Sequence, residues 1–259
     1  MMKWKTFVIG YALALALLLF AQHRPQQAQP GTFAHIVDLT HDITSGPAPH
    51  AGGQNPLPQP VAAVLRYGSH SAAGRFATRL EAPANYAPEL WTVAQIPPER
   101  LFAPLAVIDV RSQARRTSDY LLTVTDIANW EQAHGQIPQG AVVMARTGWA
   151  ERWNSPRLYR NPDSHGAPHF PGFSLQAARF LVQGRHAVGL GIDTASVDGG
   201  DGSGWSSPVR NFVLSHSVYQ IANIANLAQA PETGGLVLVA PAKLQDSPQA
   251  PVRVLALAR

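Results

Sequence analysis

A mixed α/β domain around a largely buried sheet is the fold class that this sequence predicts, and two observations support it. Short runs rich in Val, Ile and Ala lie at residues 104–111 and 140–147; each begins at a Pro or a Gly and is too short for a helix. Segments with the apolar spacing of amphipathic helices lie between and after these runs, so helices and strands alternate through the middle of the chain. We expect a single domain over residues 31–259.

The individual elements can be assigned from their end signals. Residues 35–43 form a short apolar run, and the Gly- and Pro-rich segment 45–60 that follows is expected to be a loop. A helix is expected at 123–135, because a Thr and an Asp suit its N-terminus and a Gly ends it. A second helix begins at Ser174, which suits a cap. The remaining expected elements are a helix at 212–227 and strands at 187–193, 236–241 and 252–258.

Composition and charge narrow the class of function. Hydrophobic residues make up 46% of the chain and charged residues 14%, with 22 Pro and 21 Gly, which is typical of a compact protein with many turns. The formal net charge is +4, but the basic residues are scattered and no run of five Lys or Arg occurs, so we expect no nucleic-acid partner. The absence of Cys excludes disulfides and thiol catalysis. Anionic or aromatic small molecules remain as partners.

The first 30 residues have the features of a secretory signal. Lys3 and Lys5 precede an apolar run at 7–21, which is shorter than the roughly 20 residues that cross a bilayer. We therefore interpret residues 1–30 as a signal peptide and expect a periplasmic or secreted protein. The alternative is an uncleaved N-terminal anchor, which would be the one contact with a membrane.

Several separated segments, in the expected order, resemble the cyclase family of hydrolases, which includes the metal-dependent kynurenine formamidases and isatin hydrolases. VDLTHDI at 37–43 is similar to the family's VDLTHPL, and EAPANY at 81–86 stands where the family has DAPAHF. ARTGWAERW, HFPGFSLQAARFL, GLGIDTASVD and APVRVLAL follow in register. The resemblance covers residues 35–259. It implies a mixed-sheet swivelling β/β/α domain and association as homodimers or homotetramers.

The family's metal-binding signature, H-x-G-T-H-x-D-x-P-x-H, has lost its histidines in this sequence. The resemblance places its first His at Arg75 and its second at Arg79. It places the signature Asp at Glu81 and the last His at Asn85. Each ligand position therefore carries a different residue type from the family's.

Two later positions of the family's site differ as well. The resemblance places a further His at Arg210 and a Glu at Ala222. Thr78 and Pro83 keep the signature, which predicts that the loop backbone is retained while its chemistry is not. An arginine offers only hydrogen-bond donors and stays positively charged, so it neither ligates nor tolerates a divalent cation. We therefore expect no metal at this site and no cofactor in the protein.

Three functions remain open for such a site. The leading interpretation is an exported, metal-independent enzyme that hydrolyses or rearranges a small carboxylate- or amide-bearing molecule. Glu81 would act as acid or base and Asn85 as its hydrogen-bond partner, while Arg75, Arg79 and Arg210 would bind the anionic group. The second is a non-catalytic binding protein for a small organic anion. A salt-bridged cluster that merely fills a former active site is as compatible with these residues as a ligand site is.

The third interpretation is a metal-dependent amide or lactam hydrolase with atypical ligands. Its ligands would come from His70, His165, His169 and His216.

Three further side chains are candidates for contact with a substrate. The resemblance implies that Asp193 and Ser196, at the end of a predicted strand, border the substrate. The alternative is a turn that their hydrogen bonds stabilise. Trp153 is a candidate for stacking on an aromatic substrate, whereas we expect Trp149 to be a packing residue.

Overall fold

The computed structural model describes residues 33–43, 77–200 and 207–258. The chain divides into two compact units, Met1–Phe33 and Ala34–Arg259, and every element described below belongs to the second. The expected signal peptide at residues 1–30 lies outside the described residues, as do His70 and Arg75. In the described ranges, no helix has the length and apolar character needed to span a membrane.

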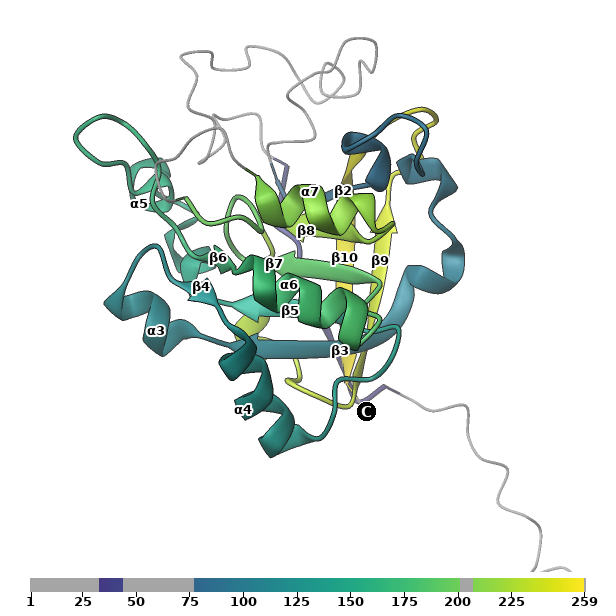
Figure 1. Ribbon diagram of the computed structural model, residues 1–259, viewed down its shortest axis with the longest axis horizontal. Coiled ribbons are helices and arrows are strands. Elements are labelled where there is room, and N and C mark those ends of the chain that lie inside the picture. The colour runs from purple at the N-terminus through teal and green to yellow at the C-terminus, as the bar shows by residue number, and fades with distance from the viewer. Residues whose placement is uncertain (1–32, 44–76, 201–206, 259) are drawn as a thin grey trace, which may run out of the picture. The chain divides into compact units, whose positions relative to one another are not determined.

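An eight-stranded mixed sheet lies at the centre of the second unit (Figure 1). Its strands are, in spatial order, β1 (His35–Asp38), β10 (Gln249–Ala258), β2 (Arg79–Glu81), β8 (Tyr219–Ala222), β7 (Gly189–Ile192), β5 (Val142–Arg146), β3 (Phe102–Asp109) and β9 (Gly235–Pro241). Strands β3, β5, β7 and β8 are parallel, and the other pairings are antiparallel. Because β9 also pairs with β10, seven strands close into a ring and β1 is added to β10 outside it. The sheet is mixed, as predicted.

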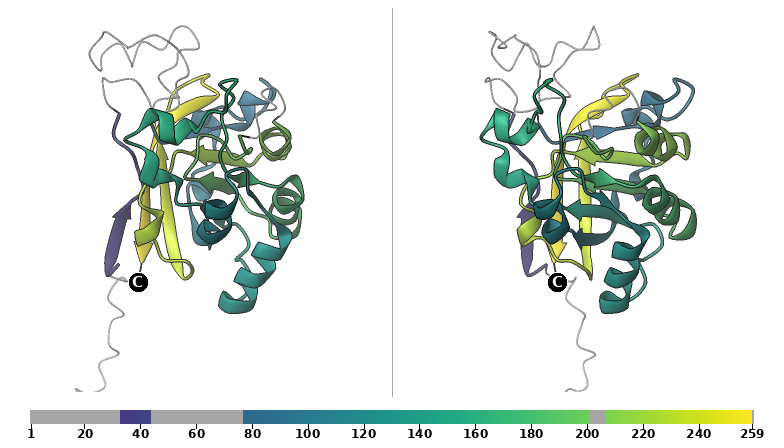
Figure 2. Two further views of the ribbon diagram at one scale, coloured as in Figure 1. Left: turned by 90° about the vertical axis from the view of Figure 1, so that its left-hand side faces the viewer. Right: turned by 60° about the vertical axis from the view of Figure 1, so that its left-hand side comes forward.

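Helices cover the outer face of the parallel strands (Figure 2). The α-helices are α3 (Arg111–Arg116), α4 (Val124–His134), α5 (Pro156–Arg160), α6 (Leu175–Arg179) and α7 (Pro208–Ser215). The shorter elements are a two-stranded sheet of β4 (Leu121–Leu122) and β6 (Gly172–Phe173), a π-helical turn η6 (Phe180–Gly184), and the 3₁₀ helices η2 (Pro83–Asn85), η3 (Val93–Gln95), η4 (Pro98–Arg100), η5 (Trp149–Arg152) and η7 (Leu227–Gln229).

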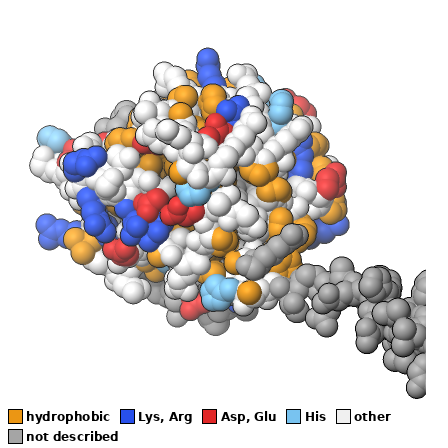
Figure 3. All heavy atoms as spheres, turned by 90° about the horizontal axis from the view of Figure 1, so that it is seen from below, with side chains coloured by type: hydrophobic (Ala, Val, Ile, Leu, Met, Phe, Trp, Pro, Cys, Tyr) orange, Lys and Arg blue, Asp and Glu red, His pale blue; other side chains and the backbone are white. Residues whose placement is uncertain are grey.

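Two hydrophobic cores lie on the two sides of the parallel strands. Alternate residues of β5 illustrate this, because Val143 and Ala145 pack under α4, α6 and α7, whereas Val142 and Met144 pack with β9 and β10. Strands covered on both faces are apolar at every position, which explains the continuous apolar runs in the sequence. On the face shown in Figure 3, basic side chains are interspersed with acidic ones.

Most of the predicted elements are confirmed. Helix α4 begins with a reciprocal capping box, in which Thr123 Oγ1 accepts from the backbone of Asp126 and the Asp126 carboxylate accepts from Thr123 N. Ser174 Oγ accepts from the backbone N of Ala177 and caps α6, as expected.

The predicted helix at 212–227 is wrong. Helix α7 ends at Ser215, and the residues that follow form β8 and η7. The chain turns at Ser217, whose φ of 57° is left-handed and cannot continue a helix. The apolar residues of β8 are buried between β2 and β7, so sheet pairing, which the local pattern does not reveal, decides their structure.

Candidate functional site

Four side chains from four elements surround the carboxylate of Glu81. Glu81 Oε1 accepts a hydrogen bond from Arg79 Nε at 3.3 Å, and Glu81 Oε2 accepts one from Arg210 Nε at 2.8 Å. The same Oε2 atom accepts from Asn85 Nδ2 at 2.7 Å and from Gln220 Nε2 at 2.9 Å. We call these five residues the ionic cluster.

Strand geometry and two short helices bring the cluster together. Arg79 and Glu81 are two apart on β2, so their side chains lie on the same face of the sheet. Glu81 pairs in register with Gln220 of β8, which places the amide beside the carboxylate. Asn85 ends η2, just beyond β2, and Arg210 lies in the first turn of α7. Strand pairing thus joins segments that are 139 residues apart in sequence.

The Glu81 carboxylate is held in its ionised form. Burial raises the pKa of Glu81, but the charges of the two arginines and the hydrogen bonds from Arg210 and Gln220 outweigh burial and lower the pKa from 4.5 to about 2. The Glu81 side chain is only 9% exposed and the Arg79 side chain 10%, whereas the Arg210 side chain is 27% exposed. Arg210 is therefore the more accessible of the two arginines.

A second carboxylate, that of Asp198, lies beside the cluster. It accepts hydrogen bonds from the backbone N of Val209 at 2.8 Å and of Arg210 at 3.1 Å, and so fixes the start of α7. Burial raises the pKa of Asp198, although these hydrogen bonds and the charge of Arg210 oppose the rise. When both carboxyl groups are ionised, two negative charges balance the two guanidinium groups.

Two hydrogen-bonding atoms of the ionic cluster have no partner in the described structure. Arg79 Nη2 donates to the carbonyl oxygen of Ala195 at 2.5 Å, but Arg79 Nη1 is buried and has no hydrogen-bond partner in the described structure. The same holds for Gln220 Oε1, a buried acceptor. Buried polar groups usually find a partner, so these two atoms are hydrogen-bonding capacity that the described structure leaves unused.

Asp193, a predicted substrate contact, is fully buried and holds a loop. Its carboxylate accepts from Thr147 Oγ1 at 2.6 Å and from the backbone N of Thr147, Gly148 and Trp149 at 2.8–3.2 Å. Burial raises the pKa of Asp193 from 3.8 to about 6 against these hydrogen bonds, which lower it. The carboxylate fixes the turn from β5 into η5.

Ser196 and Trp153, the other predicted contacts, both interact with other parts of the protein. Ser196 Oγ accepts from the backbone N of Asp198 at 3.2 Å, a hydrogen bond of the kind that the turn alternative implies. Trp153 stacks on the ring of His41, with centroids 3.9 Å apart and planes at 9°, and packs edge-on against Tyr159. The contact of either side chain with a substrate stays a prediction.

Trp149 is a packing residue, as expected. It is 1% exposed, and its Nε1 donates to the carbonyl oxygen of Tyr159 at 2.7 Å.

Comparison with known proteins assigns this architecture to a family. A family model described as putative cyclase matches residues 37–199, which is more than half of the chain. The chain belongs to the cyclase family.

Several relatives within this family are isatin hydrolases. The isatin hydrolase of Roseibium aggregatum is 34% identical over 161 residues, a match that covers 61% of this chain and 60% of the relative. The structure of isatin hydrolase A from Ralstonia solanacearum is 30% identical with a TM-score of 0.73, covering 87% of this chain and 92% of that chain. An isatin hydrolase bound to the product analogue thioisatinate shares the fold at 24% identity, with a TM-score of 0.72 and 99% of both chains covered.

The residues at the family's metal position do not fit a metal ion. Of the ionic cluster, only Glu81 is a carboxylate, and Arg79 and Arg210 present positive charge where a cation would lie. Among residues 33–43, 77–200 and 207–258, no group of three or more His, Asp or Glu side chains could hold a metal ion. His169 instead bonds Asp119 at 2.8 Å.

The structure brings together the positions that the resemblance singled out, except for Arg75, which lies outside the described residues. Arg79, Glu81, Asn85 and Arg210 are in contact, and Ala222 pairs with Arg79 across the sheet.

Sequence reasoning missed Gln220 and the carbonyl of Ala195. Gln220 lies in the segment that was wrongly predicted as a helix. It comes beside Glu81 only through the pairing of β8 with β2, which the local sequence does not reveal.

Proposed function

We propose that this cyclase-family protein binds a small organic carboxylate at the ionic cluster, without a metal ion. The observation that carries the proposal is the state of Glu81, whose two oxygens accept four hydrogen bonds from the rest of the cluster. Two guanidinium groups thus lie at the position of the family's metal, and one of their donors, Arg79 Nη1, has no partner in the described structure. They favour an anion over a cation there.

An acid or base role for Glu81 receives less support than ligand binding. A general acid or base works best with a pKa near the working pH, whereas the pKa of Glu81 is about 2. Protonating Glu81 would also break its contacts with Arg79 and Arg210. For these reasons we favour a binding protein over an acid/base enzyme. The catalytic roles of Glu81 and Asn85 stay a prediction.

The relatives suggest the class of the ligand. Their names specify isatin as substrate, and hydrolysis of the isatin lactam releases an aromatic carboxylate, of which thioisatinate is an analogue. A carboxylate entering past the partly exposed Arg210 would offer Arg79 Nη1 the acceptor that it lacks. Since Glu81 and Asp198 already balance the arginines, the protein can fold without this ligand.

Export and self-association complete the proposal. The N-terminal features support a periplasmic or secreted protein, and membership of the cyclase family supports a homodimer or homotetramer.

Calorimetric titration of the full chain with thioisatinate tests the proposal. We expect saturable binding that weakens about 10- to 100-fold in Arg79→Gln, because a charge-assisted hydrogen bond is lost. Arg115→Gln removes the same charge from an exposed position on α3 and should leave the affinity unchanged. Arg210→Gln repeats the test at a more exposed position if Arg79→Gln does not fold.

Two results would overturn the binding proposal. One is an affinity for thioisatinate that neither Arg79→Gln nor Arg210→Gln changes. The other is steady conversion of isatin to its ring-opened carboxylate by the purified chain, which would favour the enzyme alternative that the isatin hydrolase relatives suggest.

A further inference from the structure

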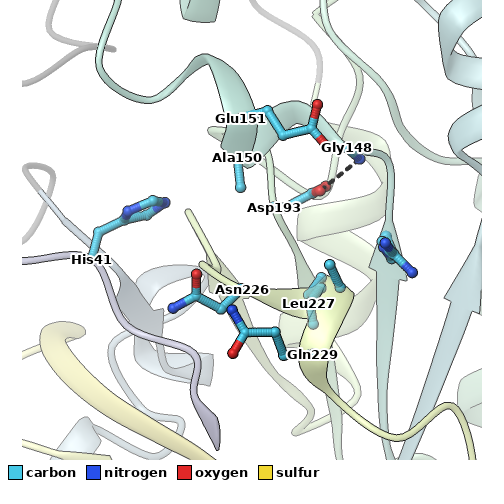
Figure 4. Close-up of a pocket in the computed structure, with 10 residues that line it drawn as sticks. His41, Gly148, Ala150, Glu151, Asp193, Asn226, Leu227 and Gln229 are labelled. Carbon is cyan, nitrogen blue, oxygen red and sulfur yellow. Dashed lines mark hydrogen bonds between the residues drawn. The ribbon is translucent and has the colours of Figure 1, made fainter.

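A cavity of about 180 Å³ opens at the carboxyl ends of β5 and β7, apart from the ionic cluster. Figure 4 shows His41 on one side of it, Ala150 above, and Asn226, Leu227 and Gln229 below. Arg146, the last residue of β5, also lines it. None of the described residues that line it belongs to the ionic cluster. The ends of parallel strands are where α/β proteins place ligand sites.

His41 lines this cavity and carries a ring nitrogen without a partner in the described structure. Its backbone N donates to Thr78 Oγ1 at 2.8 Å, and one face of its ring is covered by Trp153 at 3.9 Å, so the imidazole is held in place. Its Nε2 atom is buried and has no hydrogen-bond partner in the described structure. Burial lowers the pKa of His41 to about 4, against the opposing charge of Asp42, so the ring is neutral at neutral pH.

Arg146 supplies a positive charge that is only partly compensated. Its side chain is 14% exposed, and its contact with Asp109 is long, at 3.5 Å between Nη1 and Oδ2. Asp109 is already held by Arg111, whose Nη2 lies 2.7 Å from the same oxygen. A guanidinium buried with so weak a partner favours an anion beside it.

Two carboxylates, those of Asp193 and Glu151, line the cavity, and both interact with other groups of the protein. Asp193 is occupied by the backbone and hydroxyl donors of the Thr147–Trp149 turn. Glu151 is exposed and acts electrostatically on Arg111. The amide of Gln229 and the apolar side chains of Ala150 and Leu227 complete a wall that suits a small, partly apolar acid.

We infer that this cavity is a second small-molecule site, which takes a monocyclic carboxylate of about the size of benzoate. An apolar cavity of about 150 Å³ accepts a benzene ring in an engineered protein, so 180 Å³ suits one ring and a carboxylate. The carboxylate lies beside Arg146, the ring packs against Ala150 and Leu227, and a polar substituent meets His41 Nε2.

Titration of the full chain with sodium benzoate and with neutral benzamide tests this site. We expect benzoate to bind about tenfold or more tightly than benzamide, because only benzoate offers Arg146 a charged acceptor. Arg146→Gln should remove that preference, and Arg146→Lys should retain part of it. Arg115→Gln, on the exposed face of α3, should leave benzoate binding unchanged, and the amide signals of Gly148, Ala150 and Gln229 in NMR spectra should shift as benzoate is added.

Three results would overturn the inference. Benzoate and benzamide could bind equally, or benzoate could fail to bind in the millimolar range. Benzoate binding could instead be lost in Arg79→Gln and kept in Arg146→Gln, with shifts at Asn85 and Gln220. That last result would support the carboxylate site at the ionic cluster while removing the second site.

Discussion

Replacement of Glu81 by Gln is expected to lower the free energy of unfolding by about 3–5 kcal/mol, because it leaves the buried guanidinium group of Arg79 and the partly exposed one of Arg210 without their shared carboxylate. Arg79 and Arg210 both bond the Glu81 carboxylate, and the Glu81 side chain is 9% exposed, so water cannot replace it. Urea unfolding of Glu81→Gln beside the wild-type protein measures the difference. Glu99→Gln, an exposed glutamate in η4, is the matched control and should cost close to nothing.

The same contact predicts a distinct pH dependence. The pKa of Glu81 is lowered from 4.5 to about 2 on folding, so its stabilisation is complete above pH 4.5 and is lost as the pH falls towards 2. That loss amounts to about 3 kcal/mol in the wild-type protein and should be absent from Glu81→Gln. A variant as stable as the Glu99→Gln control would contradict the role of Glu81.

Asp193→Asn is the second change with a large expected effect, about 2–4 kcal/mol of lost stability at neutral pH. The Asp193 carboxylate accepts from Thr147, Gly148 and Trp149, and it is 1% exposed. An amide has one acceptor oxygen, and its NH₂ group would face a backbone N–H, so at least one buried donor loses its partner. Thermal and urea unfolding measure the cost.

A control and a second measurement separate this effect from loss of charge alone. Asp246→Asn changes an exposed Asp in a left-handed turn, a conformation that Asn also tolerates, and should have little effect. Amide hydrogen exchange at Gly148 and Trp149 should accelerate in Asp193→Asn and not in Asp246→Asn. Unchanged exchange at both amides would show that the carboxylate does not hold this turn.

The sequence predicts the sheet well because the parallel strands are apolar on both faces. Val142, Val143, Met144 and Ala145 form a short apolar run that fits a strand between two cores, and the helix boundaries at Thr123 and Ser174 follow from local hydrogen bonds. Both features can be predicted from the local sequence, without knowledge of tertiary contacts.

The site was only partly predictable, since much of it depends on tertiary pairing. Resemblance to the family pointed to Arg79, Glu81, Asn85 and Arg210, but their mutual contacts arise from strand register and the placement of α7. The cavity beside His41 has no sequence signal, because chain segments far apart in sequence form its walls.

The metal content of the purified protein tests most directly the idea that guanidinium groups have replaced a metal ion. The full chain would be expressed in medium supplemented with zinc and manganese, purified without chelator and analysed by elemental mass spectrometry. With Arg79 and Arg210 at the ligand positions, we predict less than about 0.1 equivalent of either metal per chain. One equivalent of zinc or manganese that is lost in Glu81→Gln would contradict that prediction and restore the metal-dependent hydrolase.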